Sequence, residues 1–449
     1  GCIGCVCGTG SSTAKGSAFT TSTIPEGESF DVDYTAHEYG HQFGGRHTFS
    51  HSTENSTVNV EPGSGVTIMG YAGITGATDV ASNSIAIFHA SSIEQITNNI
   101  KGKTCPVEIT TGNNIPVPSV LAITKTLPRG TAFKLTGTAT DADGDILSYC
   151  WEQVDDAGTT QLGNPGSFPS ETKTAGPNFR SWLPKNNGTR YFPRLEDHVA
   201  NGIAGNQWEI VPNNPAANRT LNFRMTVRDN RFGAGTNESV NVAVTFDRLI
   251  GPFLVTSQNT SGISYTQGST QTITWSVNNT TSLAGSANVN IKLSTDGGKT
   301  FPITLAANTP NDGAQDVIIP NVSAPFCRIL IEPTGNDYYA INTNDFAIGY
   351  TVNTVTACNQ YALTPNLAIP DNNTVVGFTV NVPNAGIISD VNIEEIPLKL
   401  IEMGCLPGNY VELIQIAPFG DPLYFNINDS HVAIRLETAK EIEITFEKN

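Results

Sequence analysis

One short segment, HEYGHQFGGRH at residues 37–47, has residue types and a spacing that suit metal-assisted hydrolysis. His37 and His41 are four residues apart, so on a helix they share one face and can bind one ion together. Glu38 follows the first histidine, where its carboxylate can accept a proton from an attacking water. Gly44 can adopt a positive φ, and the resulting turn would bring His47 round as a third ligand. Three imidazoles with one open position are typical of a catalytic zinc site rather than a structural one.

The alternative interpretation of this segment is a helix with three solvated or packed histidines. The chain has 7 histidines in 449 residues, and three of them fall within this segment at the spacing H-E-x-x-H-x-x-G-x-x-H. Chance seldom gathers a rare residue type in this way, because each fixed position multiplies the improbability. The sequence therefore favours a zinc site.

This motif resembles the extended zinc motif of the metzincin clan of endopeptidases. That clan also has a Met-turn beneath the metal, and Thr67-Ile68-Met69-Gly70-Tyr71 follows the third histidine at a suitable distance. By this resemblance Met69 is the Met-turn residue, the alternative being a single core methionine. Tyr71 is the counterpart of a tyrosine that touches zinc or steadies the oxyanion in some members, the alternative being a packed aromatic residue.

Within the clan the sequence is most similar to reprolysin-like (adamalysin-like) secreted bacterial proteases. It departs from them at Thr48, where many have Asp, and at Gly70, where the Met-turn usually continues to Pro. The resemblance covers residues 1–110. About 30 residues precede the expected helix, whereas metzincin domains have a twisted sheet there whose edge strand binds substrate. The expected fold is therefore the C-terminal part of an α+β metzincin catalytic domain, followed by all-β immunoglobulin-like sandwiches.

The resemblance implies a zinc metalloendopeptidase. Zinc would activate water, Glu38 would act as general base, and Tyr71 would help to stabilise the oxyanion of the tetrahedral intermediate. Protein or peptide chains are the implied substrates. The alternative is a non-catalytic extracellular adhesion or binding protein with a vestigial or incomplete protease domain. The two hypotheses differ in whether chelator-sensitive turnover is expected.

Two helices are expected to position these residues. Residues 31–46 have Asp31 and Asp33 near the start, where acidic groups favour a helix N-terminus, and Gly44-Gly45 at the end. Residues 84–101 carry an apolar stripe at helical spacing that includes Ile93, Ile96 and Ile100. We predict that the first helix presents His37 and His41 and that the second spans 84–101.

After residue 110 the sequence alternates between short β-type runs and turns, which is typical of sandwich modules. We expect a PKD-like or cadherin-like sandwich over 111–250, an immunoglobulin-like sandwich over 251–350 and a third β module over 351–449. The start of the third, residues 358–393, resembles a P domain. These modules are expected to add stability or to bind a cell surface or an extracellular polymer.

Three alternating carboxylates, Asp141, Asp143 and Asp145, surround a glycine turn in the first module. Oxygen ligands of this kind suit Ca²⁺, so a calcium site is one interpretation. No EF-hand ligand pattern accompanies them, and an ordinary solvated turn is the alternative.

Charge and cysteine content narrow the possible partners and the compartment. The net charge of −17 disfavours nucleic acid, because the chain repels phosphate groups. No apolar run is long enough for a transmembrane helix. Eight cysteines spread along a weakly charged chain favour disulfides and therefore a secreted or cell-surface protein. The crowded Cys2, Cys5 and Cys7 can alternatively be read as half of a metal site.

Overall fold

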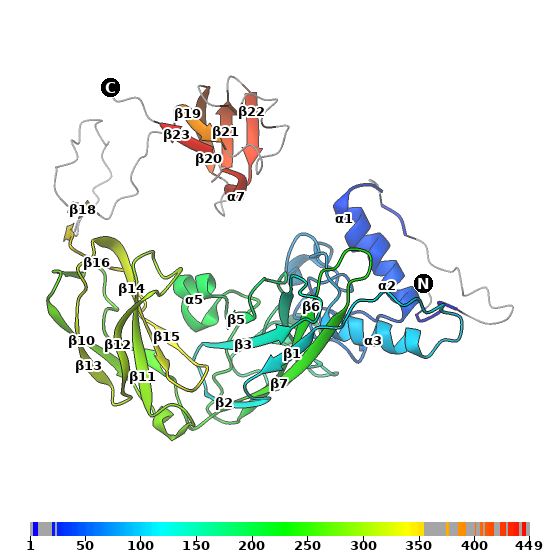
Figure 1. Cartoon of the computed structure of the whole chain (residues 1–449), viewed down its shortest axis with the longest axis horizontal. Coiled ribbons are helices and arrows are strands. Elements are labelled where there is room, and N and C mark those ends of the chain that lie inside the picture. Colours follow the sequence, from blue (N-terminus) through cyan, green and yellow to red (C-terminus); the bar gives the residue numbers. More distant parts are fainter. Residues whose placement is uncertain are drawn as a thin grey trace. The chain divides into compact units, whose positions relative to one another are not determined.

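A computed structural model describes residues 3–7, 20–22, 25–353, 374–376, 385–391, 400, 405–406, 409–416, 423–427, 430–439 and 442–445. The chain divides into two units, Gly1–Val375 and Val376–Asn449. Helices dominate the first hundred residues and β-sheets dominate the rest, as Figure 1 shows. The expected multidomain architecture, a small helical part followed by β sandwiches, is confirmed. The four module boundaries expected from the sequence stay predictions.

The first helical run continues from α1 (Glu28–Phe30) through a π-helical stretch η2 (Asp31–Ala36) into α2 (His37–Phe43). It begins three residues before the expected position and ends three residues earlier, at Phe43, with Gly44 as the C-cap. That glycine has φ 109° and its N–H bonds to the Gly40 and His41 carbonyls. The left-handed conformation explains why a glycine stands there, because a side chain would be strained.

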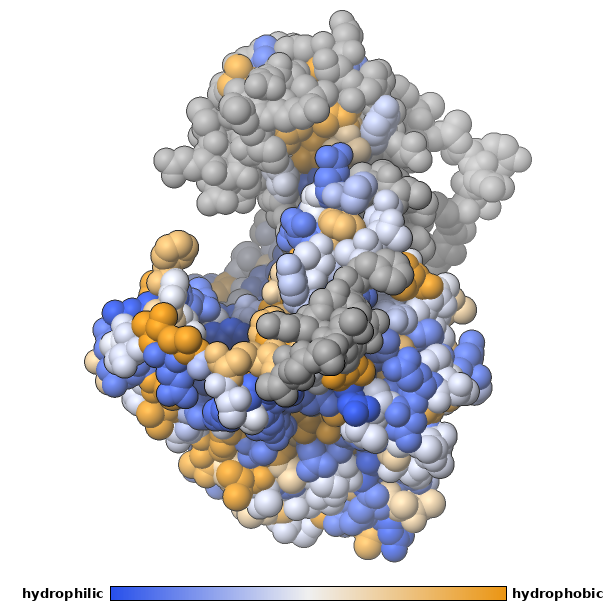
Figure 2. All heavy atoms as spheres, turned by 90° about the vertical axis from the view of Figure 1, so that its right-hand side faces the viewer, coloured by the Kyte–Doolittle hydropathy of each residue, from blue (hydrophilic) through white to orange (hydrophobic). Residues whose placement is uncertain are grey.

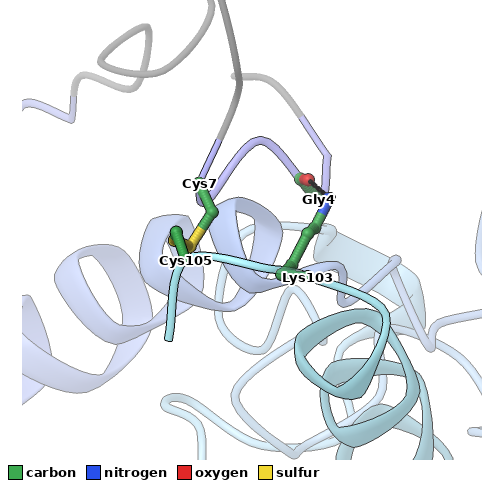
Figure 3. Close-up of a disulfide and its surroundings, with 4 residues drawn as sticks. All are labelled: Gly4, Cys7, Lys103 and Cys105. Carbon is green, nitrogen blue, oxygen red and sulfur yellow. Dashed lines mark hydrogen bonds between the residues drawn. A yellow bond between two sulfur atoms is a disulfide. The ribbon is translucent and has the colours of Figure 1, made fainter. Parts of the chain in front are cut away.

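A short N-terminal segment is attached to the end of α2. The N–H groups of Gly4 and Val6 donate to the carbonyls of His41 and Gln42, at 2.8 and 3.1 Å. A disulfide joins Cys7 to Cys105, and the Lys103 ammonium donates to the Gly4 carbonyl at 2.9 Å (Figure 3). Cys7 is therefore a disulfide partner, so the metal-site interpretation does not hold for it.

The second helix, α3 (Ala90–Lys101), begins six residues later than the sequence suggested. His89 caps its N-terminus by accepting a hydrogen bond from the Ser91 N–H. The preceding residues are not helical. The Ile85 N–H donates to the Val66 carbonyl instead, and the Ile87 carbonyl accepts from the Ile68 N–H. Between the helices lies a long loop with one 3₁₀ turn, η3 (Gly76–Thr78).

Seen from the end that carries these helices, hydrophilic and hydrophobic residues are interspersed over the surface (Figure 2).

The first sandwich has a three-stranded sheet, β1-β3-β5, and a four-stranded sheet, β2-β7-β6-β4. Alternating side chains on β3 and β6 fill the space between them, including Phe133, Leu135, Leu221 and Phe223. The elements of this region are β1 (Val117–Val120), β2 (Thr124–Pro128), β3 (Phe133–Thr140), β4 (Ser148–Gln153), α4 (Gly163–Gly166), β5 (Thr189–Phe192), α5 (Leu195–Asn201), η4 (Gly202–Ala204), β6 (Arg219–Arg228) and β7 (Asn237–Asp247).

The second sandwich pairs a sheet of order β13-β10-β8 with a six-stranded sheet, β12-β11-β14-β16-β9, in which β15 also pairs with β14. One hydrophobic cluster runs through both sandwiches, and Phe253 and Tyr338 are in ring contact at 5.1 Å within it. The elements are β8 (Leu254–Val255), β9 (Ser264–Tyr265), β10 (Thr270–Ser276), η5 (Thr280–Ser282), β11 (Asn288–Ser294), β12 (Ile303–Pro310), β13 (Ala314–Ile318), β14 (Ala324–Pro333), β15 (Ala340–Ile341) and β16 (Phe346–Ile348).

A two-stranded sheet, β17 (Thr351–Asn353) with β18 (Thr374–Val376), follows. The second unit holds a five-stranded sheet of order β22-β21-β20-β19-β23. Its elements are β19 (Ala385–Val391), β20 (Tyr410–Ile416), β21 (Leu423–Ile427), β22 (Ser430–Ile434), α7 (Leu436–Ala439) and β23 (Ile442–Thr445). Most of residues 358–393, on which the P-domain prediction rests, lies outside the described residues.

Candidate metal centre

The three motif histidines converge. Ligand atoms of His37, His41 and His47 all lie within 4.8 Å of one another, and His41 Nε2 is 3.1 Å from His47 Nε2. His37 and His41 are buried on α2, and the turn at Gly44 brings His47 to their side, as the spacing predicted. Four-coordinate zinc binds imidazole nitrogen at about 2.0–2.1 Å, which places neighbouring ligand atoms roughly this far apart.

Each imidazole is oriented by a hydrogen bond at its other nitrogen. His37 Nδ1 lies 2.7 Å from the Ile68 carbonyl, and His41 Nδ1 lies 2.8 Å from the Gly45 carbonyl. His47 Nδ1 lies 2.8 Å from Glu54 Oε1. These partners only accept hydrogen bonds, so each neutral ring carries its proton on Nδ1 and leaves Nε2 bare. Two bare nitrogens 3.1 Å apart repel each other unless a cation lies between them, so the residues fit a metal ion.

The protonation of the triad also suits a metal. Burial, followed by the charge of nearby His41, lowers the pKa of His37 from 6.5 to about 3. Burial lowers the pKa of His47 too, although the hydrogen bond that His47 donates to Glu54 opposes that effect. Both rings are therefore neutral near pH 7, and the neutral form is the one that can ligate.

Glu38 and Tyr71 lie in the cleft beside the triad. This cleft, of about 650 Å³, is lined by His37, Glu38 and Tyr71 among other residues. Glu38 Oε2 is buried and has no hydrogen-bond partner in the described structure. A buried carboxylate oxygen without a donor is costly unless another group completes it, and an attacking water would do so.

Tyr71 packs against the ligands, with ring centroids 5.6 Å from His37 and 4.7 Å from His47. Burial first, then the charges of Glu54 and Glu38, raises the pKa of Tyr71 above 10.0. The phenol therefore keeps its proton and can donate a hydrogen bond into the cleft. The sequence alternatives for this residue, a packed aromatic side chain or an oxyanion donor, are both compatible with its position.

Met69 lies beneath the active-site helix. It is fully buried, and a Cβ added to Gly40 would meet its sulfur at 2.3 Å. Its carbonyl accepts from the Thr48 N–H at 3.1 Å, which ties the turn to the residue after His47. The turn itself closes through Gly70 N–H to the Thr67 carbonyl at 2.8 Å. This is the position that the resemblance implied for a Met-turn residue.

Two carboxylates that the sequence analysis missed support the site. Glu54 holds His47, as described. Glu61, only 1% exposed, accepts from the Thr48 hydroxyl at 2.6 Å, the Thr67 hydroxyl at 2.5 Å and the Val66 and Thr67 N–H groups at 3.0 and 3.2 Å. It therefore links the segment after His47 to the Met69 turn. No motif marks either residue, although an isolated Glu in an apolar stretch, as at 61, is a weak signal for burial with partners.

The first sandwich packs against the loop that carries Met69 and against the start of α3. Trp208 packs with Val66 and Val80 in one hydrophobic cluster and stacks on Phe168 at 4.8 Å. Arg180 donates to the Val80 carbonyl at 3.2 Å, and Glu152 Oε2 accepts from the Ala90 N–H at 2.9 Å. The loop that carries Met69 is thus packed against the sandwich.

The acidic cluster in the first sandwich is different. Ligand oxygens of Asp141, Asp143 and Asp145 also lie within 4.8 Å of one another. However, Arg231 NH1 lies 3.3 Å from Asp143 and 3.5 Å from Asp145, and Asp143 accepts two hydrogen bonds from Asn114. The guanidinium already supplies positive charge there, so the calcium prediction is not supported.

The described helices give no membrane-spanning candidate, since none is both long and apolar enough.

Comparison with known proteins identifies two regions. Residues 1–100 match the model of metallo-peptidase family M12B, reprolysin-like. Residues 379–445 match the model of the FeoA domain, a different family from the P domain suggested by the sequence. Among curated proteins none matches the chain. A metallopeptidase M12B-like region is therefore followed by β sandwiches.

Among solved structures, the chain is similar to iron(II) transport protein A of Clostridium thermocellum, at 31% identity and a TM-score of 0.13. That match covers 14% of this chain and 41% of the transport protein. The fibronectin(III)-like modules of Clostridium thermocellum CbhA match at 8% identity, covering 51% of this chain and 94% of theirs, with a TM-score of 0.16. The four N-terminal Ig domains of Dscam1 isoform 6.9 match at 10% identity, covering 52% and 46%, with a TM-score of 0.14.

Proposed function

We propose that the chain is a secreted, zinc-dependent metalloendopeptidase of the metzincin type that hydrolyses peptide bonds of proteins. The observation that carries the proposal is the convergence of three oriented imidazoles beside a buried, unpartnered Glu38 oxygen. The match of residues 1–100 to a metallopeptidase family supports it. His37, His41 and His47 would hold the zinc.

When bound, zinc supplies a Lewis acid that acidifies water and stabilises negative charge on the substrate carbonyl oxygen. Glu38, on the cleft side of α2, accepts the proton of the attacking water and passes it to the leaving amine. Tyr71 keeps its proton and donates a hydrogen bond to the oxyanion of the tetrahedral intermediate. The hydrogen bonds at each Nδ1 keep the three rings in place.

The test is hydrolysis of a mixed peptide pool by the full chain. Turnover should vanish after chelation and return when zinc is restored. Glu38→Gln should lower turnover by about 10²–10⁴-fold while zinc content is unchanged. Glu28→Gln, an exposed carboxylate on the same helical run, is the matched control and should leave turnover unchanged.

A Glu38→Gln protein that turns over like the parent would refute the assigned role. Zinc binding without any turnover by the parent would favour the other hypothesis, an extracellular binding protein whose protease domain does not catalyse.

A further inference from the structure

A second cavity, of about 250 Å³, lies in the first sandwich and is separate from the metal centre. We call it the cationic cavity, because four positively charged side chains and one carboxylate, Glu196, line it. The cations are Lys185, Arg190, Arg194 and, from the second sandwich, Lys299. Such a cluster is unusual in a chain with 41 acidic and 24 basic residues.

The two arginines are already paired. Arg190 NH2 lies 2.7 Å from the fully buried Glu209, and Arg194 Nε lies 2.9 Å from Asp197. Within the described residues, Lys185 and Lys299 have no ion-pair partner. The positive charge available to a ligand is therefore that of the two lysines, and both are exposed at the cavity.

Aromatic side chains form the walls. Trp182 is held between two guanidinium groups, with Arg180 and Arg194 at 3.9 and 3.6 Å from its ring centre. Its indole N–H donates to Glu209 at 3.0 Å, and the Trp151 indole N–H donates to the Gly188 carbonyl at 2.9 Å. These walls are thus rigid before any ligand binds, which lowers the entropic cost of binding.

Neutral hydrogen-bonding groups complete the lining. Tyr149, Tyr191, Asn187 and Thr189 all border the cavity. Neither tyrosine hydroxyl has a hydrogen-bond partner among the residues that the structure describes. The Thr189 hydroxyl lies 3.0 Å from the Thr136 hydroxyl, and Asn187 Oδ1 accepts from the Thr189 N–H, so the two tyrosine hydroxyls are the groups left for a ligand. Free hydroxyls on aromatic rings suit a polyhydroxylated ring.

We propose that the cationic cavity binds a carboxylated or sulfated sugar unit of an acidic polysaccharide. The lysines would pair with the anionic group, and the rings of Tyr149 and Tyr191 would cover the apolar face of the sugar ring. An acidic peptide would use the lysines alone and leave the two tyrosines without a role, so the sugar is favoured. This site is distinct from the proposed peptidase centre and gives the chain a means to stay on a polymer.

The test is calorimetric titration of the full chain with galacturonic acid trimer and, separately, with a heparin-derived tetrasaccharide, which distinguish carboxylate from sulfate. Maltotriose and triglutamate serve as neutral and peptidic comparisons. The double variant Lys185→Gln/Lys299→Gln should weaken binding by at least about tenfold, equivalent to about 1.4 kcal/mol. Lys101→Gln/Arg248→Gln removes the same charge at exposed positions elsewhere and should bind like the parent.

Binding should also weaken as salt rises, because exposed charges are screened. The proposal is overturned if neither acidic sugar binds, if maltotriose or triglutamate binds as tightly, or if the lysine variant binds like the parent. Thermal melting of both double variants checks that they are folded. Because the readout is binding, its outcome does not depend on peptidase activity.

Discussion

The two clusters that could hold a cation, the histidine triad and the aspartate cluster, differ in their surroundings rather than in their convergence. Both bring three ligand atoms within 4.8 Å. In the triad, a hydrogen bond at Nδ1 orients every imidazole. His41 and His47 then present unprotonated Nε2 atoms to each other. In the aspartate cluster a guanidinium from Arg231 is already within 4 Å of two carboxylates.

Proximity of ligand atoms alone therefore does not make a metal site. A cation binds where the protein has brought lone pairs together and left their repulsion unbalanced. Where an internal cation already balances the charge, a metal ion would have to displace it. The following predictions test that distinction.

The largest effect is expected when a ligand of the triad is removed. His41→Ala should reduce the zinc content after dialysis from about one ion per chain to almost none, because a site with two imidazoles holds the metal weakly. Metal analysis of the purified protein is the measurement. Asp143→Ala is the matched change in the other cluster and should leave the zinc content unaltered. Zinc retained by His41→Ala would contradict the role of His41 as a metal ligand.

Removal of Glu61 should have the next largest effect, a loss of unfolding free energy. Glu61→Ala leaves two backbone N–H groups and two hydroxyls without an acceptor in a buried place, which should cost about 3 kcal/mol of unfolding free energy. Urea unfolding measures it. Asp145→Asn, in the more exposed aspartate cluster, should cause a smaller loss. An equal loss in both variants would show that burial does not distinguish the clusters.

Substitution of Glu54 should have a moderate effect on zinc affinity. Glu54→Gln weakens the acceptor that orients His47, and such partners commonly contribute 10–100-fold to metal affinity. Because Glu54 is half exposed, we expect about tenfold weaker zinc binding in a competition titration against a chelator. The exposed Glu28→Gln should bind zinc like the parent. An unchanged affinity in Glu54→Gln would mean that the His47 ring is oriented without it.

The smallest effect is expected from calcium. Addition of 10 mM Ca²⁺ should move the melting temperature of the parent by less than about 1 °C, because Arg231 already pairs with the aspartates. Arg231→Gln would free them. A site with a dissociation constant near 1 mM, common in extracellular modules, would then add about 1.4 kcal/mol and raise melting by about 2–4 °C. A calcium-dependent shift in the parent would contradict the interpretation.

The convergence of His37, His41 and His47 could be predicted from the sequence, because it depends on local spacing within one helix and one turn. Glu54 and Arg231 could not be predicted in the same way. Glu54 meets His47 only because of how the intervening loop folds, and Arg231 comes from a strand connection far along the chain from Asp145. The start of α3 was also misjudged, because residues 85–87 bond to the Met69 loop instead of extending the helix.

Prediction of the strands from the sequence is limited in the same way. The runs 133–141, 221–229 and 240–247 alternate in the sequence, and they form β3, β6 and β7 within a few residues. Alternation does not indicate β4, SYCWEQ, because this strand is buried along most of its length and has no exposed face. Its outward residues are covered by other segments, as when Glu152 accepts from Ala90 and Gln153 accepts from Asn178. A strand with two covered faces does not alternate, so periodicity could not identify it.

The packing of the Met69 loop on Trp208 has a consequence for how this chain can evolve. A Cβ added to Gly63 would lie 2.6 Å from the Trp208 ring, so the two positions cannot vary independently. The first sandwich is therefore not an interchangeable attachment that recombination could replace with another β module. We expect residues 60–85 and the sandwich surface around Trp208 to be inherited as one block, with exchange between proteins confined to the segments that follow.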